Sequence, residues 1–283
     1  MATCAAHLSP VVKYHGLARR HPPPHGFLMR PQLNADTLGG RPNVRRELES
    51  RGFVTVPNAI GEAARGRLLR LLEPERLQGA ARHRSGVVFG ARHLLTTIAE
   101  LTPELAASGV DELASTLLGR DAFPIDAAYF DKQSVANWTV PVHQDRVLPV
   151  APDLVRKHRT TNGVAVSEPS TTALARLLAI RIHFDPADGE TGALFVLPGS
   201  HSRGVLTPDQ IRAIPLTSFK PCVANVGDAI VMRPLLLHRS PPSNGEGQRR
   251  VLHVVYASEQ PDDGLRWRAS AQQAVEAVGR TSS

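Results

Sequence analysis

The sequence predicts a mainly β protein in which a helical layer packs against one side of a double-sheet β core. Two observations carry this prediction. The first part of the chain has helical periodicity, whereas the part after Phe123 consists of short β-branched and aromatic runs separated by Gly, Pro and Asp. Many short strands with such punctuation are typical of a sandwich or barrel. With 42% hydrophobic residues among 283, the chain can bury a substantial core.

The helical part begins after a proline-containing segment, residues 1–42, which has little periodicity and which we expect to be poorly structured. A single domain is expected over residues 43–270, followed by a C-terminal tail, 271–283. In order, the patterns predict a helix at 44–49, a strand at 52–56, an amphipathic helix at 61–73, and helices at 94–107 and 110–119.

The β part follows without an internal repeat. Strands are expected at 125–134, 138–145, 177–185, 193–197, 219–226, 228–237 and 250–258. Residues 146–172 interrupt this rhythm, because they contain several prolines and charges but no convincing periodicity. A loop of that length is usually functional or disordered, so both a lid over a site and a flexible connection stay open.

The charge of the chain limits the classes of binding partner that are expected. The net charge is +7 and the calculated pI is 10.1, and arginine supplies 29 of the 33 basic residues. These arginines are scattered and do not alternate with aromatic residues, which make up only 5% of the chain. A nucleic-acid-binding protein is therefore disfavoured, and we expect surface charge with a mild attraction for anionic small molecules.

The cysteine content and the N-terminal residues bear on location. Cys4 and Cys222 are the two cysteines, and they make no disulfide framework, which favours a reducing cytoplasm. The first 30 residues contain no apolar stretch long enough for a signal peptide or a membrane span. We expect neither export nor membrane anchoring, and a monomer or weak dimer.

The most informative motif is His143-Gln144-Asp145, followed much later by His238. Side chains alternate along a strand, so His143 and Asp145 share a face while Gln144 points away. Two imidazoles and one carboxylate are the ligand set of non-haem Fe(II) oxygenases. Arg249 adds a guanidinium, whose two-pronged donor geometry matches a carboxylate.

A second pair, His183 and Asp185, has the same spacing and must be weighed against the first. Asp185 opens the turn Asp185-Pro186-Ala187-Asp188-Gly189, where a carboxylate commonly caps its own backbone. The pair at 143 and 145 is therefore the favoured metal site.

Three separated segments carry a family resemblance: residues 140–145, residues 190–201 (ETGALFVLPGSH) and residues 227–238 (GDAIVMRPLLLH). Together they closely resemble the phytanoyl-CoA dioxygenase family, over about residues 52–258. The resemblance implies a double-stranded β-helix, which is a cupin-like jelly roll, and an Fe(II)- and 2-oxoglutarate-dependent oxygenase. The family pattern often has Trp before the first histidine, whereas this chain has Val142.

The resemblance also implies roles for individual residues. His143, Asp145 and His238 become the metal ligands, and Arg249, eleven residues after His238, becomes the partner of the far carboxylate of 2-oxoglutarate. The resemblance further implies cosubstrate contacts from Ser240, Gln133 and Lys132, of which the last two are rivals. A one-residue slip of the strand would exchange Arg249 and Arg250.

The expected substrate is a small molecule, with O2 as the co-reactant. Arg146, Arg181 and Trp138 are substrate-side candidates. Because related halogenases lack the carboxylate ligand, Asp145 favours hydroxylation, or a desaturation or cyclisation variant, over halogenation. Alternatives from other classes are a non-catalytic jelly-roll binding protein, a basic nucleic-acid-interacting protein and a Zn(II) hydrolase, which would not need Arg249.

Overall fold

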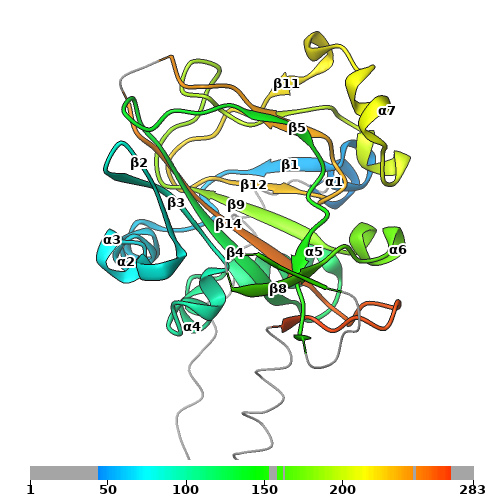
Figure 1. Ribbon diagram of the computed structural model, residues 1–283, viewed down its shortest axis with the longest axis horizontal. Coiled ribbons are helices and arrows are strands. Elements are labelled where there is room, and N and C mark those ends of the chain that lie inside the picture. Colours follow the sequence, from blue (N-terminus) through cyan, green and yellow to red (C-terminus); the bar gives the residue numbers. More distant parts are fainter. Residues whose placement is uncertain (1–43, 153–157, 162, 245–246, 269–283) are drawn as a thin grey trace, which may run out of the picture. The chain divides into compact units, whose positions relative to one another are not determined.

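Two antiparallel sheets face each other in the computed structural model, which describes residues 44–152, 158–161, 163–244 and 247–268 (Figure 1). The strand order of the larger sheet is β1-β12-β9-β14-β4-β3-β2. Its strands are β1 (Phe53–Val56), β2 (Ala81–Arg84), β3 (Val87–Arg92), β4 (Phe123–Lys132), β9 (Leu178–His183), β12 (Ala229–Met232) and β14 (Arg249–Ala257).

The smaller sheet has the order β11-β10-β13-β5. Its strands are β5 (Val140–His143), β10 (Phe195–Val196), β11 (Lys220–Pro221) and β13 (His238–Ser240). Figure 1 shows β5 and β11 above the long strands β4 and β14. The predicted N-terminal segment and C-terminal tail, residues 1–42 and 271–283, lie outside the described residues.

Helices cover the face of the larger sheet that points away from the smaller one. These helices are α1 (Val44–Arg51), α2 (Glu62–Leu71), α3 (Pro74–Leu77), α4 (Leu101–Ala107) and α5 (Val110–Leu118). Two further helices lie elsewhere: α6 (Thr171–Ala175), and α7 (Pro208–Arg212), which Figure 1 shows beside β11. Leu68 of α2 and Leu113 of α5 share a buried cluster with Ile180 and Leu252 of the central strands. Within the described residues, no helix has the length and apolarity that a membrane span requires.

The other face of the larger sheet lines the interior of the sandwich. Because side chains alternate along each strand, Ile180 and Leu252 point to the helices while their neighbours Arg181 and His253 point inward. Apolar side chains fill one part of the interior, including Val196, Ile230 and Met232. Polar side chains gather in the remaining part. The predicted mainly β, double-sheet fold with helices on one side is confirmed.

The strands expected at 219–226 and 228–237 are shorter in the structure, and two further predicted segments differ in kind. The helix expected at 94–107 is a 3-10 turn, Leu94–Thr96, followed by α4. Pro103 lies in the first turn of α4, where its missing N–H is tolerated, so the helix cannot extend further back. Residues 146–172 contain a small sheet of β6 (Leu148–Pro149), β8 (Val164–Ser167) and β7 (Arg159–Thr161).

Gly52 ends α1 and leads into β1. Its φ is +80°, and its N–H donates to the carbonyl oxygen of Leu48, as in the left-handed residue that commonly closes a helix. A Cβ at this position would lie 2.4 Å from Nδ1 of His201 and 2.9 Å from a methyl carbon of Leu236. No side chain fits there without displacing its neighbours.

We expect Gly52→Ala to lower the free energy of unfolding by about 2 to 5 kcal/mol, from backbone strain of about 1 to 2 and overpacking of about 1 to 3. Urea unfolding measures the change. Gly189→Ala is the matched control, since a Cβ there meets nothing within 4 Å. Equal stability of the two variants would contradict this account.

Candidate metal and cosubstrate site

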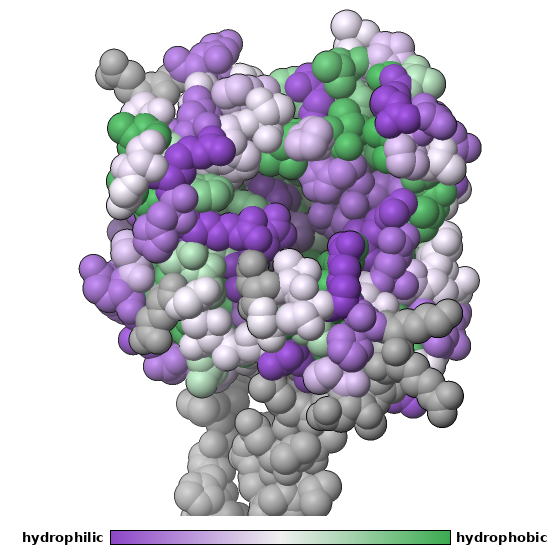
Figure 2. All heavy atoms as spheres, in the orientation of Figure 1, coloured by the Kyte–Doolittle hydropathy of each residue, from purple (hydrophilic) through white to green (hydrophobic). Residues whose placement is uncertain are grey.

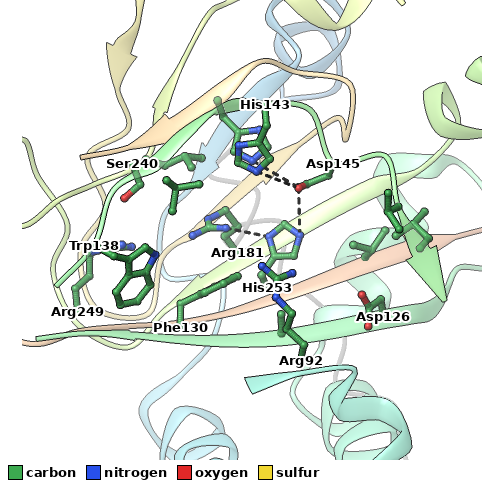
Figure 3. Close-up of a pocket in the computed structure, with 17 residues that line it drawn as sticks. Arg92, Asp126, Phe130, Trp138, His143, Asp145, Arg181, Ser240, Arg249 and His253 are labelled. Carbon is green, nitrogen blue, oxygen red and sulfur yellow. Dashed lines mark hydrogen bonds and ion pairs between the residues drawn. The ribbon is translucent and has the colours of Figure 1, made fainter. Parts of the chain in front are cut away.

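The pairing of β13 with β5 places His238 directly opposite His143. The centroids of the two rings lie 4.1 Å apart. Asp145 lies just beyond the end of β5, where its N–H donates to the carbonyl oxygen of Pro234. One ligand atom from each of the three residues lies within 4.8 Å of the other two. The structure therefore brings the three predicted metal ligands together (Figure 3).

The orientation of the two rings leaves one lone pair free on each. Nδ1 of His143 lies 2.8 Å from the carbonyl oxygen of Pro141, and Nδ1 of His238 lies 2.9 Å from that of Leu236. A carbonyl oxygen only accepts hydrogen bonds, so Nδ1 of each ring carries the proton. Nε2 of each neutral ring then presents its lone pair to the cluster, as a metal ligand does.

The charges in this cluster fit a cation. Burial lowers the pKa of His238 to about 4, so the ring is neutral. Burial alone would raise the pKa of Asp145, yet it lies well below its usual range, so the group is a carboxylate. The distances from Asp145 to Nε2 of His143 and of His238 are 3.5 and 3.6 Å, longer than a hydrogen bond. A carboxylate and two lone pairs around one point suit a divalent metal ion.

Gln144 holds the turn that places Asp145. Its side chain is buried and donates to the carbonyl oxygens of Gly204 and Leu235, while its Oε1 accepts from the N–H of Leu206. The side chain of Gln144 thus points away from the cluster although Asp145 is no longer part of the strand. The hydrogen bonds of the Gln144 side chain, rather than strand pairing, therefore fix the position of the turn that carries Asp145.

Arg249 lies on the inner face of the larger sheet, and Arg250 on the outer face. Arg249 is 3% exposed, and its Nε and Nη1 have no partner among the described residues. Burial, with repulsion from Arg181, lowers the pKa of Arg249 to about 9. Arg250 instead makes two 2.8 Å hydrogen bonds to the carboxylate of Asp185. A buried guanidinium with unsatisfied donors fits an anionic group such as a carboxylate.

Lys132 is the cross-strand neighbour of Arg249 and is fully buried. Its Nζ donates to Oγ of Ser240 at 2.8 Å and to the carbonyl oxygen of Pro241 at 2.5 Å. Ser240 in turn donates its hydroxyl hydrogen to the carbonyl oxygen of Gly192 at 2.7 Å. Ser240 could therefore donate to a bound carboxylate only if this last hydrogen bond broke.

The cluster opens into a cavity between the two sheets. Figure 2 shows this face of the molecule hollowed near its centre, with largely hydrophilic side chains around the hollow. Deeper in the cavity the walls are partly apolar, with Phe130, Trp138 and Leu148 among the lining residues. Figure 3 shows Arg249 near Trp138 and Asp126 on the opposite side of the histidines. The cavity therefore extends to both sides of the metal cluster.

Two sequence-predicted positions, Gln133 and Arg146, have other partners in the structure. Gln133 donates to Asp131, and neither Gln133 nor Lys132 lines the cavity. Of the two rivals, Lys132 is the one that contacts a lining residue, Ser240. Arg146 forms an ion pair with Glu168 and also lies outside the cavity lining. Among the substrate-side candidates, Arg181 and Trp138 line the cavity.

The alternative pair, His183 and Asp185, does not form a metal site among the described residues. The carboxylate of Asp185 is paired with Arg250, as described above, rather than capping its own turn. That turn is closed instead by Asp188, whose Oδ1 accepts from the N–H groups of Glu190 and Thr191. His183 is fully buried, and burial lowers its pKa to about 3.

One further residue lies beside the three metal ligands and was not among the predicted ligands and cosubstrate contacts. His253 lies four positions after Arg249 on β14, and its Nε2 is 3.6 Å from Oδ2 of Asp145. Strand alternation from Arg249 already places His253 on the inner face, but packing in the core is the ordinary role of such a residue.

This arrangement defines a class of protein: a double-sheet β core with two histidines and one carboxylate at a cavity, as in metal-dependent oxygenases. The comparisons with known proteins agree with it. The sequence profile of the family described as phytanoyl-CoA dioxygenase (PhyH) matches residues 48–251. A search of curated proteins found no match.

Solved structures share the fold at low sequence identity. EvdO2 from Micromonospora carbonacea var. aurantiaca, complexed with 2-oxoglutarate, is 18% identical over 78% of this chain and 94% of its own, with a TM-score of 0.54. The α-ketoglutarate-dependent carbocyclase SnoK from nogalamycin biosynthesis is 17% identical over 76% and 83% of the two chains, with a TM-score of 0.57. EctD from S. alaskensis, with 2-oxoglutarate and 5-hydroxyectoine, is 15% identical over 77% of each chain, with a TM-score of 0.58.

The chain belongs to the phytanoyl-CoA dioxygenase family. The predicted family, the jelly-roll fold and the dioxygenase class are confirmed.

Proposed function

We propose that the protein hydroxylates a small-molecule substrate, with His143, Asp145 and His238 holding Fe(II) and Arg249 holding 2-oxoglutarate. The observation that carries the proposal is the pair of lone pairs on Nε2 of His143 and His238, which face the Asp145 carboxylate across a cavity. The unsatisfied guanidinium of Arg249 lines the same cavity. The cavity therefore offers a metal ion two nitrogen lone pairs and a carboxylate, and it offers a dicarboxylate the guanidinium of Arg249.

Bound Fe(II), 2-oxoglutarate and O2 supply the oxidising chemistry for a C–H bond. The chain contributes binding, charge and shape. Asp145 contributes the negative charge of the metal site, and Arg249 with Lys132 supplies positive charge for the dianion. Phe130, Trp138 and Leu148 give the cavity apolar walls that limit access of water.

Arg181 and Trp138 are the substrate-side residues that we retain, because both line the cavity. Arg146 is paired with Glu168 outside the cavity, so we do not retain it as a substrate-side residue. The small sheet formed by residues 148–149, 159–161 and 164–167 borders the cavity through Leu148. We propose that this sheet contributes to substrate recognition.

The proposal is tested without a substrate. Purified apo-protein is loaded with Fe(II) under anaerobic conditions, and 2-oxoglutarate is added. We expect a visible metal-to-ligand charge-transfer band, since the metal and the keto acid come together at one site. A folded, metal-loaded protein without the band would remove the support for an oxygenase and favour the alternative of a non-catalytic binding protein.

Lys132 gives a prediction on pH. Burial, with repulsion from Arg249 and Arg181, lowers its pKa from 10.5 to about 7 in the free protein. A bound dianion beside Arg249 favours the charged lysine, so it raises this pKa. Binding of 2-oxoglutarate then takes up a proton above the pKa of the free protein, and the affinity falls as the pH rises through it.

Calorimetry at about pH 8 in two buffers of different ionisation enthalpy measures this proton uptake. We expect net uptake in the wild-type protein and none in Lys132→Met. The Lys220→Met variant, at an exposed lysine of β11, is the control and keeps the wild-type uptake. Proton uptake unchanged in Lys132→Met would assign it to another group.

Two further predictions from the sequence stay open to measurement. A monomer or weak dimer is checked by light scattering over a range of protein concentrations. A reducing cytoplasmic location is proposed from the cysteine content, and the described cysteine, Cys222, is a buried free thiol.

A further inference from the structure

The third histidine of the cavity, His253, is held by two neighbouring strands. It is 7% exposed and lies beside Arg181 in the pairing of β14 with β9. Nη1 of Arg181 is 3.1 Å from Nδ1 of His253. The ring of Phe130 packs against both residues, 6.4 Å from the His253 ring centroid and 5.6 Å from Cζ of Arg181. The ring of His253 is thus fixed in position.

The contact with Arg181 determines which nitrogen of His253 carries the proton. A guanidinium only donates hydrogen bonds, so Nδ1 of His253 must accept. A ring that accepts at Nδ1 has no hydrogen on that nitrogen, so the ring is neutral and has one N–H. That N–H is therefore on Nε2, which points at Asp145 (Figure 3).

His253 is in this respect the opposite of His143 and His238. Those rings donate from Nδ1 to backbone carbonyls and present a lone pair from Nε2. His253 accepts at Nδ1 and presents a hydrogen. An N–H repels a metal ion but attracts a carboxylate oxygen, so His253 is suited to contact a ligand rather than to be one.

The two oxygens of Asp145 have different surroundings. Oδ1 lies 3.5 Å from Nε2 of His143. Oδ2 lies 3.6 Å from Nε2 of His238 and 3.6 Å from Nε2 of His253. The larger sheet contributes the N–H of His253, which faces Oδ2 of Asp145. At 3.6 Å the contact is an electrostatic attraction, longer than a hydrogen bond.

We propose that His253, kept in its Nε2–H form by Arg181, is a positioning residue that orients the Asp145 carboxylate for metal binding. The inference rests on the proposed metal site. Asp145 stands outside any strand, so its side chain depends on such contacts more than His143 and His238 do. Groups that orient metal ligands typically change metal affinity 10- to 100-fold, roughly, when they are removed.

The test compares two substitutions at one position. His253→Leu removes the N–H and keeps an apolar side chain, whereas His253→Gln retains an amide N–H donor. Affinity for Co(II) is measured by titration, and the Co(II) visible absorption spectrum reports the ligand geometry. His143→Ala serves as the ligand-loss control, and urea unfolding of each variant checks that it is folded.

We expect His253→Leu to weaken Co(II) binding by about 10- to 100-fold with an altered spectrum, and His253→Gln to restore most of the affinity. Wild-type affinity in His253→Leu would overturn the inference, and so would a His253→Gln variant as weak as His253→Leu, which would indicate a direct ligand. If His143→Ala bound Co(II) as wild type does, the metal site itself would be wrong, and that failure is distinguishable from the other two.

A second measurement does not depend on a variant that folds. Nitrogen NMR of ¹⁵N-histidine-labelled wild-type apo-protein distinguishes a protonated from a bare ring nitrogen. We expect the His253 ring to carry its proton on Nε2, and Arg181→Met to shift the proton partly to Nδ1. A proton on Nδ1 in the wild-type protein would overturn the inference.

Discussion

Replacing Asp145 with alanine is expected to abolish stable Fe(II) binding and the charge-transfer band with 2-oxoglutarate. The substitution removes the one anionic group of the three-residue metal site. Its effect on metal affinity should exceed the roughly 10- to 100-fold loss typical of residues that only orient a ligand. Anaerobic metal titration followed by 2-oxoglutarate addition measures both properties.

Asp126→Ala is the matched control, because Asp126 also presents a carboxylate to the cavity. Its Oδ1 lies 3.2 Å from Nδ1 of His93, and it is not part of the metal cluster. We expect its metal affinity to stay close to that of the wild type. Equal losses in the two variants would show that general cavity charge, and not coordination by Asp145, governs metal binding.

Replacing Arg249 with leucine is expected to raise the dissociation constant of 2-oxoglutarate while metal binding is kept. Loss of one partner of a buried charge pair costs about 2 to 5 kcal/mol. This corresponds to a roughly 30- to 5,000-fold weaker affinity. Titration of the charge-transfer band with 2-oxoglutarate at saturating Fe(II) gives the constant directly.

Arg250→Leu separates this effect from a general loss of positive charge on β14. Arg250 is paired with Asp185 on the outer face of the sheet, so its removal should lower stability and leave the 2-oxoglutarate affinity nearly unchanged. If Arg250→Leu weakened 2-oxoglutarate binding as much as Arg249→Leu, the strand register inferred for the cosubstrate would be wrong.

The general fold was predictable because its two periodicities are strong. Ala64 and Leu68 of α2 lie four residues apart on a buried face, as do Leu113 and Leu117 of α5. The strands after Phe123 are separated by clear turn residues. The hairpin of β2 and β3 was not predicted. Residues 81–84 alternate too weakly, with two arginines and a histidine, although Ser85 and Gly86 both have the positive φ of a tight two-residue turn.

The candidate site was predictable to the extent that spacing alone brings residues together. Residues i and i+2 share a face, so His143 and Asp145 converge, and Arg249 follows from the family resemblance. What spacing could not show is which buried polar groups satisfy one another. Gln133 and Lys132 are sequence neighbours, yet only the structure shows that Lys132 turns inward to Ser240.

The tautomers were beyond sequence reasoning for the same reason. His143, His238 and His253 are identical side chains on β-strands. Their roles differ because of what lies at Nδ1, which is a backbone carbonyl for the first two and a guanidinium for the third. That partner is fixed by tertiary packing and leaves no mark in the local sequence.

The two halves of the site belong to different layers of the sandwich. His143 and His238 are on the smaller sheet, whereas Arg249 and Lys132 are on the larger one. Under the proposed function, a dicarboxylate held by the metal at one end and by Arg249 at the other would span the gap between the two sheets. Binding of the dicarboxylate would then link the two sheets, so that the ligated protein would be stiffer than the free protein.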